Sequence, residues 1–164
     1  MPWPWLLAAV WVVLDQASKL AVVAGIPPHR SVELIPGVLN LVHVHNRGAA
    51  FGLLDEGAGW QVVLLAAVAV AAIAALGVWL YQLGRREPAT RLALALILGG
   101  AVGNLIDRVR LGYVIDFVDV HWYQAYHYPA FNVADSGITL GAILLIVLLV
   151  HEERSARSGP RKPS

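Results

Sequence analysis

The sequence predicts an all-α integral membrane protein, a four-transmembrane-helix bundle with a small extracytoplasmic β or loop element. Composition is the first reason: 58% of the 164 residues are hydrophobic and only 14% are charged. Soluble domains carry roughly a quarter charged residues. The second reason is that the chain contains separate apolar runs close to the ~20 residues that a membrane-spanning helix needs. The length suits one compact bundle, so we expect a single membrane-embedded domain over 1–164.

The expected spans cover about 3–23, 60–81, 89–108 and 132–150, and the polar tail 151–164 is expected to be flexible. A cleaved signal peptide is the alternative for the first run. No Lys or Arg precedes this run, however, and Asp15 and Lys19 interrupt it, which favours a retained helix. In the third span, Gly99 and Gly103 form a small-xxx-small pair that favours close packing of another helix.

Two longer segments between the runs lack any spanning stretch. Residues 25–59 contain a short β-prone sequence, Leu39 to His45, typical of a strand. The segment from Val109 to Ala130 is rich in aromatic residues, which suit a membrane interface. These segments supply the expected β or loop element.

Basic residues predict the orientation. The second connection and the tail contain seven of them, whereas the opposite side contains four. The seven are Arg85, Arg86, Arg91, Arg154, Arg157, Arg161 and Lys162, and the four are Arg30, Arg47, Arg108 and Arg110. The positive-inside rule then places both termini in the cytoplasm and both longer segments outside.

Two aspartates stand in strongly apolar surroundings near the fourth span, Asp116 and Asp135. An ionised carboxylate is costly near hydrocarbon, and two carboxylates that meet can share one proton and act as acid and base. For Asp135, the alternative is a structural role, since Asn132 as N-cap would place it at the third helical position. The spacing alone does not choose Asp116 over Asp119: on a helix both face the same way, whereas on a strand they face opposite sides.

Further polar residues fall at the same outer membrane depth in this topology. Asp15 and Lys19 are four apart on one helix face, either as a functional pair or as an ion pair that only orients the helix. Asn104 and Arg108 share a face at the end of the third span. For Asp107 and Arg110 beside them, a polar helix end emerging into water is an equally good interpretation. Because polar groups from several segments meet at this depth, we expect the chemistry at the outer face.

Five motifs then stand in order along the chain. They are Asp15–Lys19 (DQASK), Asn46–Gly52 (NRGAAFG), Gly99–Arg108 (GGAVGNLIDR), Val114–Phe117 (VIDF) and Phe131–Ser136 (FNVADS). Together they closely resemble those of the bacterial lipoprotein signal peptidases, the signal peptidase II family. Each motif alone is weak, but five in this order are specific and cover almost the whole chain.

The resemblance implies an aspartic endopeptidase of the bacterial cytoplasmic membrane that cuts prolipoproteins before a diacylglyceryl-modified cysteine. It implies Asp116 and Asp135 as the catalytic pair, with no cofactor and no metal. Six residues match positions that shape or support the family's site: Asp15, Lys19, Asn46, Asn104, Arg108 and Asn132. The expected partners are prolipoproteins and membrane lipids, with no nucleic acid, and we expect a monomer.

Two other function classes remain open from the residues alone. His43, His45, His121 and His127 are candidate ligands of a metal-dependent hydrolase, although the chain contains no HExxH. An ion-coupled transporter would also use membrane carboxylates, but it would place them near the midplane. With no cysteine, the chain has no disulfide, thiolate ligand or cysteine nucleophile.

Overall fold

The computed structural model describes residues 2–48, 60–83, 87–123 and 126–157. Its long helices are α1 (Trp3–Gly25), α2 (Trp60–Gln82), α3 (Pro88–Leu111) and α4 (Val133–Arg157). Each is long and apolar enough to cross a membrane, which confirms the four expected spans. Helix α4 continues past 150 to Arg157, so the first part of the expected flexible tail is helical. The sequence there, HEERSAR, contains neither Gly nor Pro to end a helix.

Helix α3 is the centre of the bundle and packs against each of the other three helices. In its most apolar window 56% of the residues are buried, against none in the corresponding window of α2. Its glycines explain the close packing. A side chain on Gly99 would meet Ala8 and Trp11 of α1, and one on Gly100 would meet the backbone carbonyl of Ala134 in α4. The expected close approach at Gly99 and Gly103 is therefore present.

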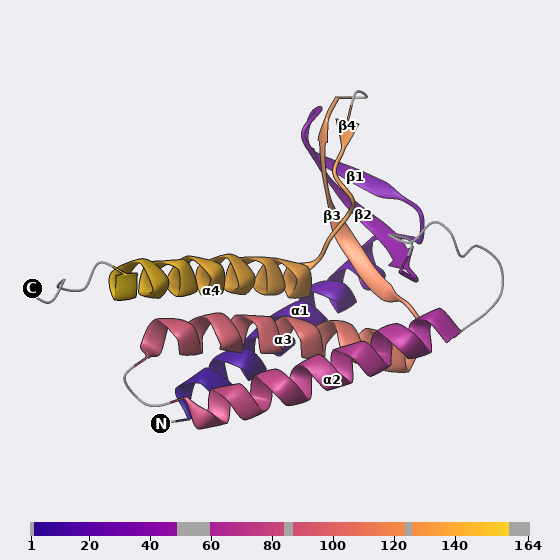
Figure 1. The fold of residues 1–164 in the computed structure, drawn as a ribbon. Coiled ribbons are helices and arrows are strands. Elements are labelled where there is room, and N and C mark those ends of the chain that lie inside the picture. The colour runs from indigo at the N-terminus through magenta and orange to yellow at the C-terminus, as the bar shows by residue number, and fades with distance from the viewer. Residues whose placement is uncertain (1, 49–59, 84–86, 124–125, 158–164) are drawn as a thin grey trace, which may run out of the picture.

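A small antiparallel sheet stands at one end of the bundle (Figure 1). Its strands are β1 (Ser31–Ile35), β2 (Leu39–Asn46), β3 (Val114–Trp122) and the two-residue β4 (Tyr126–His127), paired in that order. The expected strand at 39–45 is confirmed as β2. Strand β3 pairs with β2 across the sequence, with Val44 opposite Asp116. This pairing joins the two longer segments between the spans into one element.

The start of α1 and the end of α4 lie at the end of the bundle opposite the sheet (Figure 1). The end of α3 leads directly into the sheet. Gly112 adopts the left-handed conformation (φ 77°) that suits glycine, and its N–H donates to the carbonyl of Arg108 at 3.1 Å. Strand β3 then begins at Val114, which places Asp116 close to the polar end of α3.

Candidate active site

Asp116 and Asp135 are both bound by one residue, Asn132. Asp116 lies in β3 and is only 2% exposed, whereas Asp135 is half-buried in the first turn of α4. The Asn132 side-chain amide donates to Asp116 Oδ1 at 2.7 Å, and its backbone N–H donates to Asp135 Oδ2 at 3.2 Å. One fully buried residue therefore positions both carboxylates.

The same contacts form the cap of α4. The backbone N–H of Asp135 donates back to Asn132 Oδ1 at 2.9 Å, which completes a reciprocal capping arrangement. The cap expected from the sequence is confirmed, with Asp135 at the third helical position. The structural and functional interpretations of Asp135 are not exclusive, because its carboxylate caps the helix and also faces the site.

Two more amides bind the carboxylates. The Asn46 side chain donates to Asp116 Oδ2 at 2.8 Å, and its own oxygen accepts the Gly48 N–H at 2.8 Å. The Asn104 side chain donates to Asp135 Oδ1 at 2.7 Å. Each carboxylate thus accepts a hydrogen bond on both of its oxygens. The motif Asn46–Gly52 extends beyond the described residues after Gly48.

Burial raises the pKa of the Asp116 carboxyl to about 6 from its ordinary 3.8. The hydrogen bond from Asn46 opposes this rise, the negative charge of Asp135 adds to it, and the hydrogen bond from Asn132 again lowers the pKa. A carboxyl that titrates near neutral pH beside a second carboxylate is suited to acid–base catalysis.

A buried ionic cluster contacts the residues that surround Asp116 and Asp135. Lys19, only 1% exposed, contacts Asp15 Oδ2 and Asp107 Oδ2, both at 2.8 Å, and donates to Asn104 Oδ1 at 3.0 Å. Asp15 Oδ1 accepts the backbone N–H of Ala134 at 2.9 Å, so it also binds the N-terminus of α4. The pairing of Asp15 with Lys19 is present, and it does more than orient α1.

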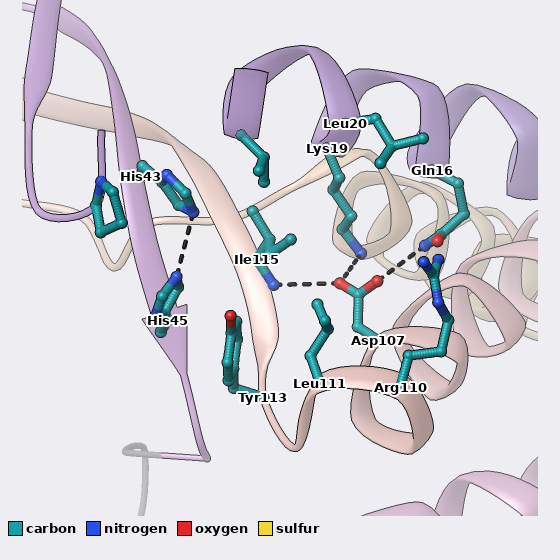
Figure 2. A pocket seen from close by; sticks show the side chains of 12 residues that line it. Gln16, Lys19, Leu20, His43, His45, Asp107, Arg110, Leu111, Tyr113 and Ile115 are labelled. Carbon is teal, nitrogen blue, oxygen red and sulfur yellow. Dashed lines mark hydrogen bonds and ion pairs between the residues drawn. The ribbon is translucent and has the colours of Figure 1, made fainter. Parts of the chain in front are cut away.

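Asp107 is a member of this cluster, as Figure 2 shows, and does not emerge into water. Its Oδ2 accepts the backbone N–H of Ile115 at 3.1 Å, and its Oδ1 accepts the Gln16 side-chain amide at 2.9 Å. It therefore fixes the strand at the residue before Asp116. Sequence reasoning left Asp107 open and did not consider Gln16. Their positions inside two of the quoted motifs were the available signal.

Arg108 lies near the carboxylate pair, whereas Asp119 does not. Arg108 is half-buried, donates to the carbonyl of Asn104 at 3.4 Å and interacts with the charges of Asp135 and Asp116. Asp119, three positions after Asp116 on a strand, faces the other side and accepts a hydrogen bond from Asn40 at 3.0 Å. The strand thus selects Asp116 as the neighbour of Asp135. Arg110, unlike Asp107, is exposed.

The histidines do not gather at the carboxylates. His43 and His45 contact each other on β2, and His121 lies 3.7 Å from Asp119. The side chain of His127 lies outside the described part of the chain. Within that part, no group of three or more His, Asp or Glu side chains is arranged to hold a metal ion. The geometry thus gives the metal-hydrolase interpretation no support.

Comparison with known proteins agrees with this geometry. The family model described as signal peptidase (SPase) II matches residues 7–151, which is most of the chain. The chain belongs to the signal peptidase II family. As a signal peptidase II it is an aspartic peptidase that removes signal peptides.

Similar proteins cover nearly the whole chain. The lipoprotein signal peptidase of Pseudomonas putida KT2440 is 46% identical over 94% of this signal peptidase II and 90% of its own length. The lipoprotein signal peptidase of Pseudomonas aeruginosa PAO1 is 42% identical over 96% of this chain and 93% of its own length. A bacterial membrane enzyme solved by the in meso method at 1.9 Å superposes with a TM-score of 0.79, at 31% identity over 91% of this chain and 93% of that one.

Proposed function

We propose that this signal peptidase II removes signal peptides from prolipoproteins by cutting directly before a diacylglyceryl-modified cysteine, with Asp116 and Asp135 as the catalytic pair. The observation that supports this most is the double contact of the buried Asn132, which binds both carboxylates. The relatives, which are lipoprotein signal peptidases, support prolipoproteins as the substrate class.

The carboxylate pair activates water. In the working state the two groups hold one proton between them, because two adjacent carboxylates do not both ionise easily. The ionised carboxylate takes a proton from the attacking water, and the protonated one donates to the scissile carbonyl oxygen. When the tetrahedral intermediate collapses, the C–N bond breaks and a proton passes to the amino group of the cysteine. That residue becomes the new N-terminus.

The surrounding residues hold the pair in position. Asn46, Asn104 and Asn132 orient the carboxylate oxygens, and the positive charge of Arg108 stabilises negative charge that develops near Asp135. Asp15 and Lys19 support the pair from below through Ala134 and Asn104. These groups come from a single chain, and the reaction needs no cofactor or metal. We therefore propose that the active unit is one peptidase domain over residues 1–164, working as a monomer.

The proposed location is the bacterial cytoplasmic membrane, with both termini cytoplasmic and the active site at the outer face. The basic residues of the second connection and the tail support this orientation. Asp116 lies in β3 and Asp135 in the first turn of α4. The sheet stands at the end of the bundle opposite the start of α1 (Figure 1). At that depth the acyl chains of a substrate remain in the bilayer while its peptide reaches water.

Cleavage of a diacylglyceryl-modified lipobox peptide by the purified protein tests the proposal. Asp116→Asn and Asp135→Asn should each lose several orders of magnitude in rate, because an amide neither accepts nor donates the required proton. The double variant should be little worse than either single variant, since the two residues act as one unit. Asp119→Asn, on the same strand but facing away, is the control and should retain much more activity.

A near wild-type rate for folded Asp116→Asn would refute the assignment of the pair. Cleavage of the same peptide without its diacylglyceryl group at an equal rate would refute the proposed substrate class while leaving the pair intact.

A further inference from the structure

His43 and His45 form a cluster that the proposed chemistry does not use. They are two positions apart on β2, so their side chains lie on the same face of the sheet. His45 pairs with Ile115, whereas the next residue, Asn46, contacts Asp116. The two imidazoles therefore lie on the face of the sheet opposite to that of the Asp116 side chain.

The two rings point their Nε2 atoms at each other. The Nε2 atoms are 3.2 Å apart, and the ring centroids are 5.0 Å apart with planes at 72°. Zinc–nitrogen bonds of about 2.0–2.1 Å in a tetrahedral site separate two ligand nitrogens by roughly 3.3 Å. The pair thus has nearly the spacing that a shared metal ion requires.

Each ring is also held in this orientation by a second contact. His43, only 3% exposed, has its Nδ1 at 2.8 Å from the carbonyl oxygen of Ile26, so in the neutral ring Nδ1 carries the proton and Nε2 carries none. Histidines that bind metals usually donate their other N–H to such a carbonyl. His45 stacks on Tyr113, with ring centroids 4.0 Å apart.

Both histidines line a cavity of about 260 Å³, shown in Figure 2. A cavity of this volume is large enough to hold several water molecules. Asp107 lines the same cavity, but its oxygens already bind Lys19, Ile115 and Gln16. The protein therefore offers two nitrogen ligands here, and water would occupy the other positions.

We propose that His43 and His45 bind one divalent transition-metal ion of the zinc, nickel and copper class, which imidazole ligands favour. Without metal, His45 donates its Nε2 proton to the bare Nε2 of His43. On metal binding, the His45 proton moves to Nδ1 and both Nε2 atoms become ligands, with no net proton release. The site is distinct from the carboxylate pair and does not depend on the proposed function.

Calorimetric titration of the purified full-length protein with Zn²⁺ and Ni²⁺, after removal of any affinity tag, tests this site. We expect one ion per chain and a rise in the thermal unfolding temperature, because binding to the folded state stabilises it. His45→Phe keeps a ring that can stack on Tyr113 but lacks the nitrogen. Loss of an outer partner of a ligating histidine already costs roughly 10–100-fold in affinity, so His45→Phe should lose at least about tenfold.

His151→Ala is the matched control, since this exposed residue lies on α4, far along the chain from the site, and its loss should leave the affinity unchanged. His43→Gln serves as a second variant in case one substitution disturbs folding, which unfolding without metal would reveal. Peptide cleavage by metal-free His45→Phe should stay near wild type. The proposal is overturned if wild type binds no ion saturably, or if His45→Phe and His43→Gln both bind as tightly as wild type.

Discussion

At the scale of single residues, opposing interactions act on the ionisation of the Asp116 carboxyl group. Burial in β3 disfavours the ionised form, whereas the amides of Asn46 and Asn132 favour it. Burial prevails, and the pKa rises to about 6. Folding therefore favours the protonated carboxyl over the carboxylate. Asp116 contributes most to stability below the ordinary pKa of 3.8, and this contribution is lost as the pH rises through 6.

The pH dependence of stability should therefore change in Asp116→Asn. The shift of the pKa from 3.8 to about 6 corresponds to about 2–3 kcal/mol of unfolding free energy between pH 4 and pH 8. Relative to wild type, the free energy of unfolding of the variant should increase by about this amount as the pH is raised over that range. Its new amide faces the Asn46 and Asn132 donors, so it starts with a constant loss at every pH. Unfolding in detergent at several pH values measures the difference, and a difference independent of pH would contradict the prediction.

The ionic cluster gives a second residue-scale prediction. Lys19→Met leaves Asp15 and Asp107 buried without their cation, which should cost about 3–5 kcal/mol of unfolding free energy. Asp107→Asn leaves the Asp15–Lys19 pair neutral and should cost less. The double variant should be more stable than Lys19→Met alone, because only one unpaired carboxylate remains. Chemical unfolding of the three variants decides this, and simple additivity of the two losses would disprove the electrostatic account.

At the scale of elements, the N-terminus of α4 is held by contacts from several parts of the fold. Its first turn is capped by Asn132, bound by Asp15 and packed against Gly100 of α3. The backbone of α4 therefore approaches α3 where these two helices supply Asp135 and Asn104. Any change in their separation acts on the hydrogen bond between those two side chains.

Gly100→Ala should separate these helices. The added methyl group would overlap the carbonyl oxygen of Ala134, which is backbone and does not rotate away. We expect a loss of about 1–3 kcal/mol in stability, together with a large fall in cleavage rate in the fraction that folds. Gly25→Ala is the control, because a methyl group there meets no atom within 4 Å. Equal behaviour of the two variants in unfolding and peptide cleavage would reject this role of Gly100.

At the scale of the whole molecule, the sequence predicted most of the fold because its strongest signals are local. Apolar runs identify the spans, and the cap at Asn132 and the Asp15–Lys19 pair lie within one turn of helix. The contacts of Asp107 with Lys19 and Ile115 join separate elements, so no spacing could indicate them. The choice of Asp116 over Asp119 likewise required knowing that β3 is a strand.

The orientation in the membrane is the molecular-scale prediction. A reporter fused near residue 86 should read cytoplasmic and one near residue 57 external, because the basic residues of the second connection favour the inside. Both fusion points lie outside the described residues, so the prediction rests on charge and on the four spans. The reverse pattern would place the carboxylate pair on the cytoplasmic side and remove exported proteins from its reach.

The contact between Asp15 and Ala134 has a consequence for when the enzyme becomes active. The two residues are 119 positions apart and belong to the first and last helices. At about 5–20 residues per second, the ribosome needs roughly 6 to 24 s to synthesise that interval. During this time α1 is complete, but Ala134 and the second proposed catalytic carboxylate, Asp135, have not yet been synthesised. Proteolytic competence therefore begins only when the final span has been inserted, and the nascent chain passes through the membrane insertion machinery as an inactive protein.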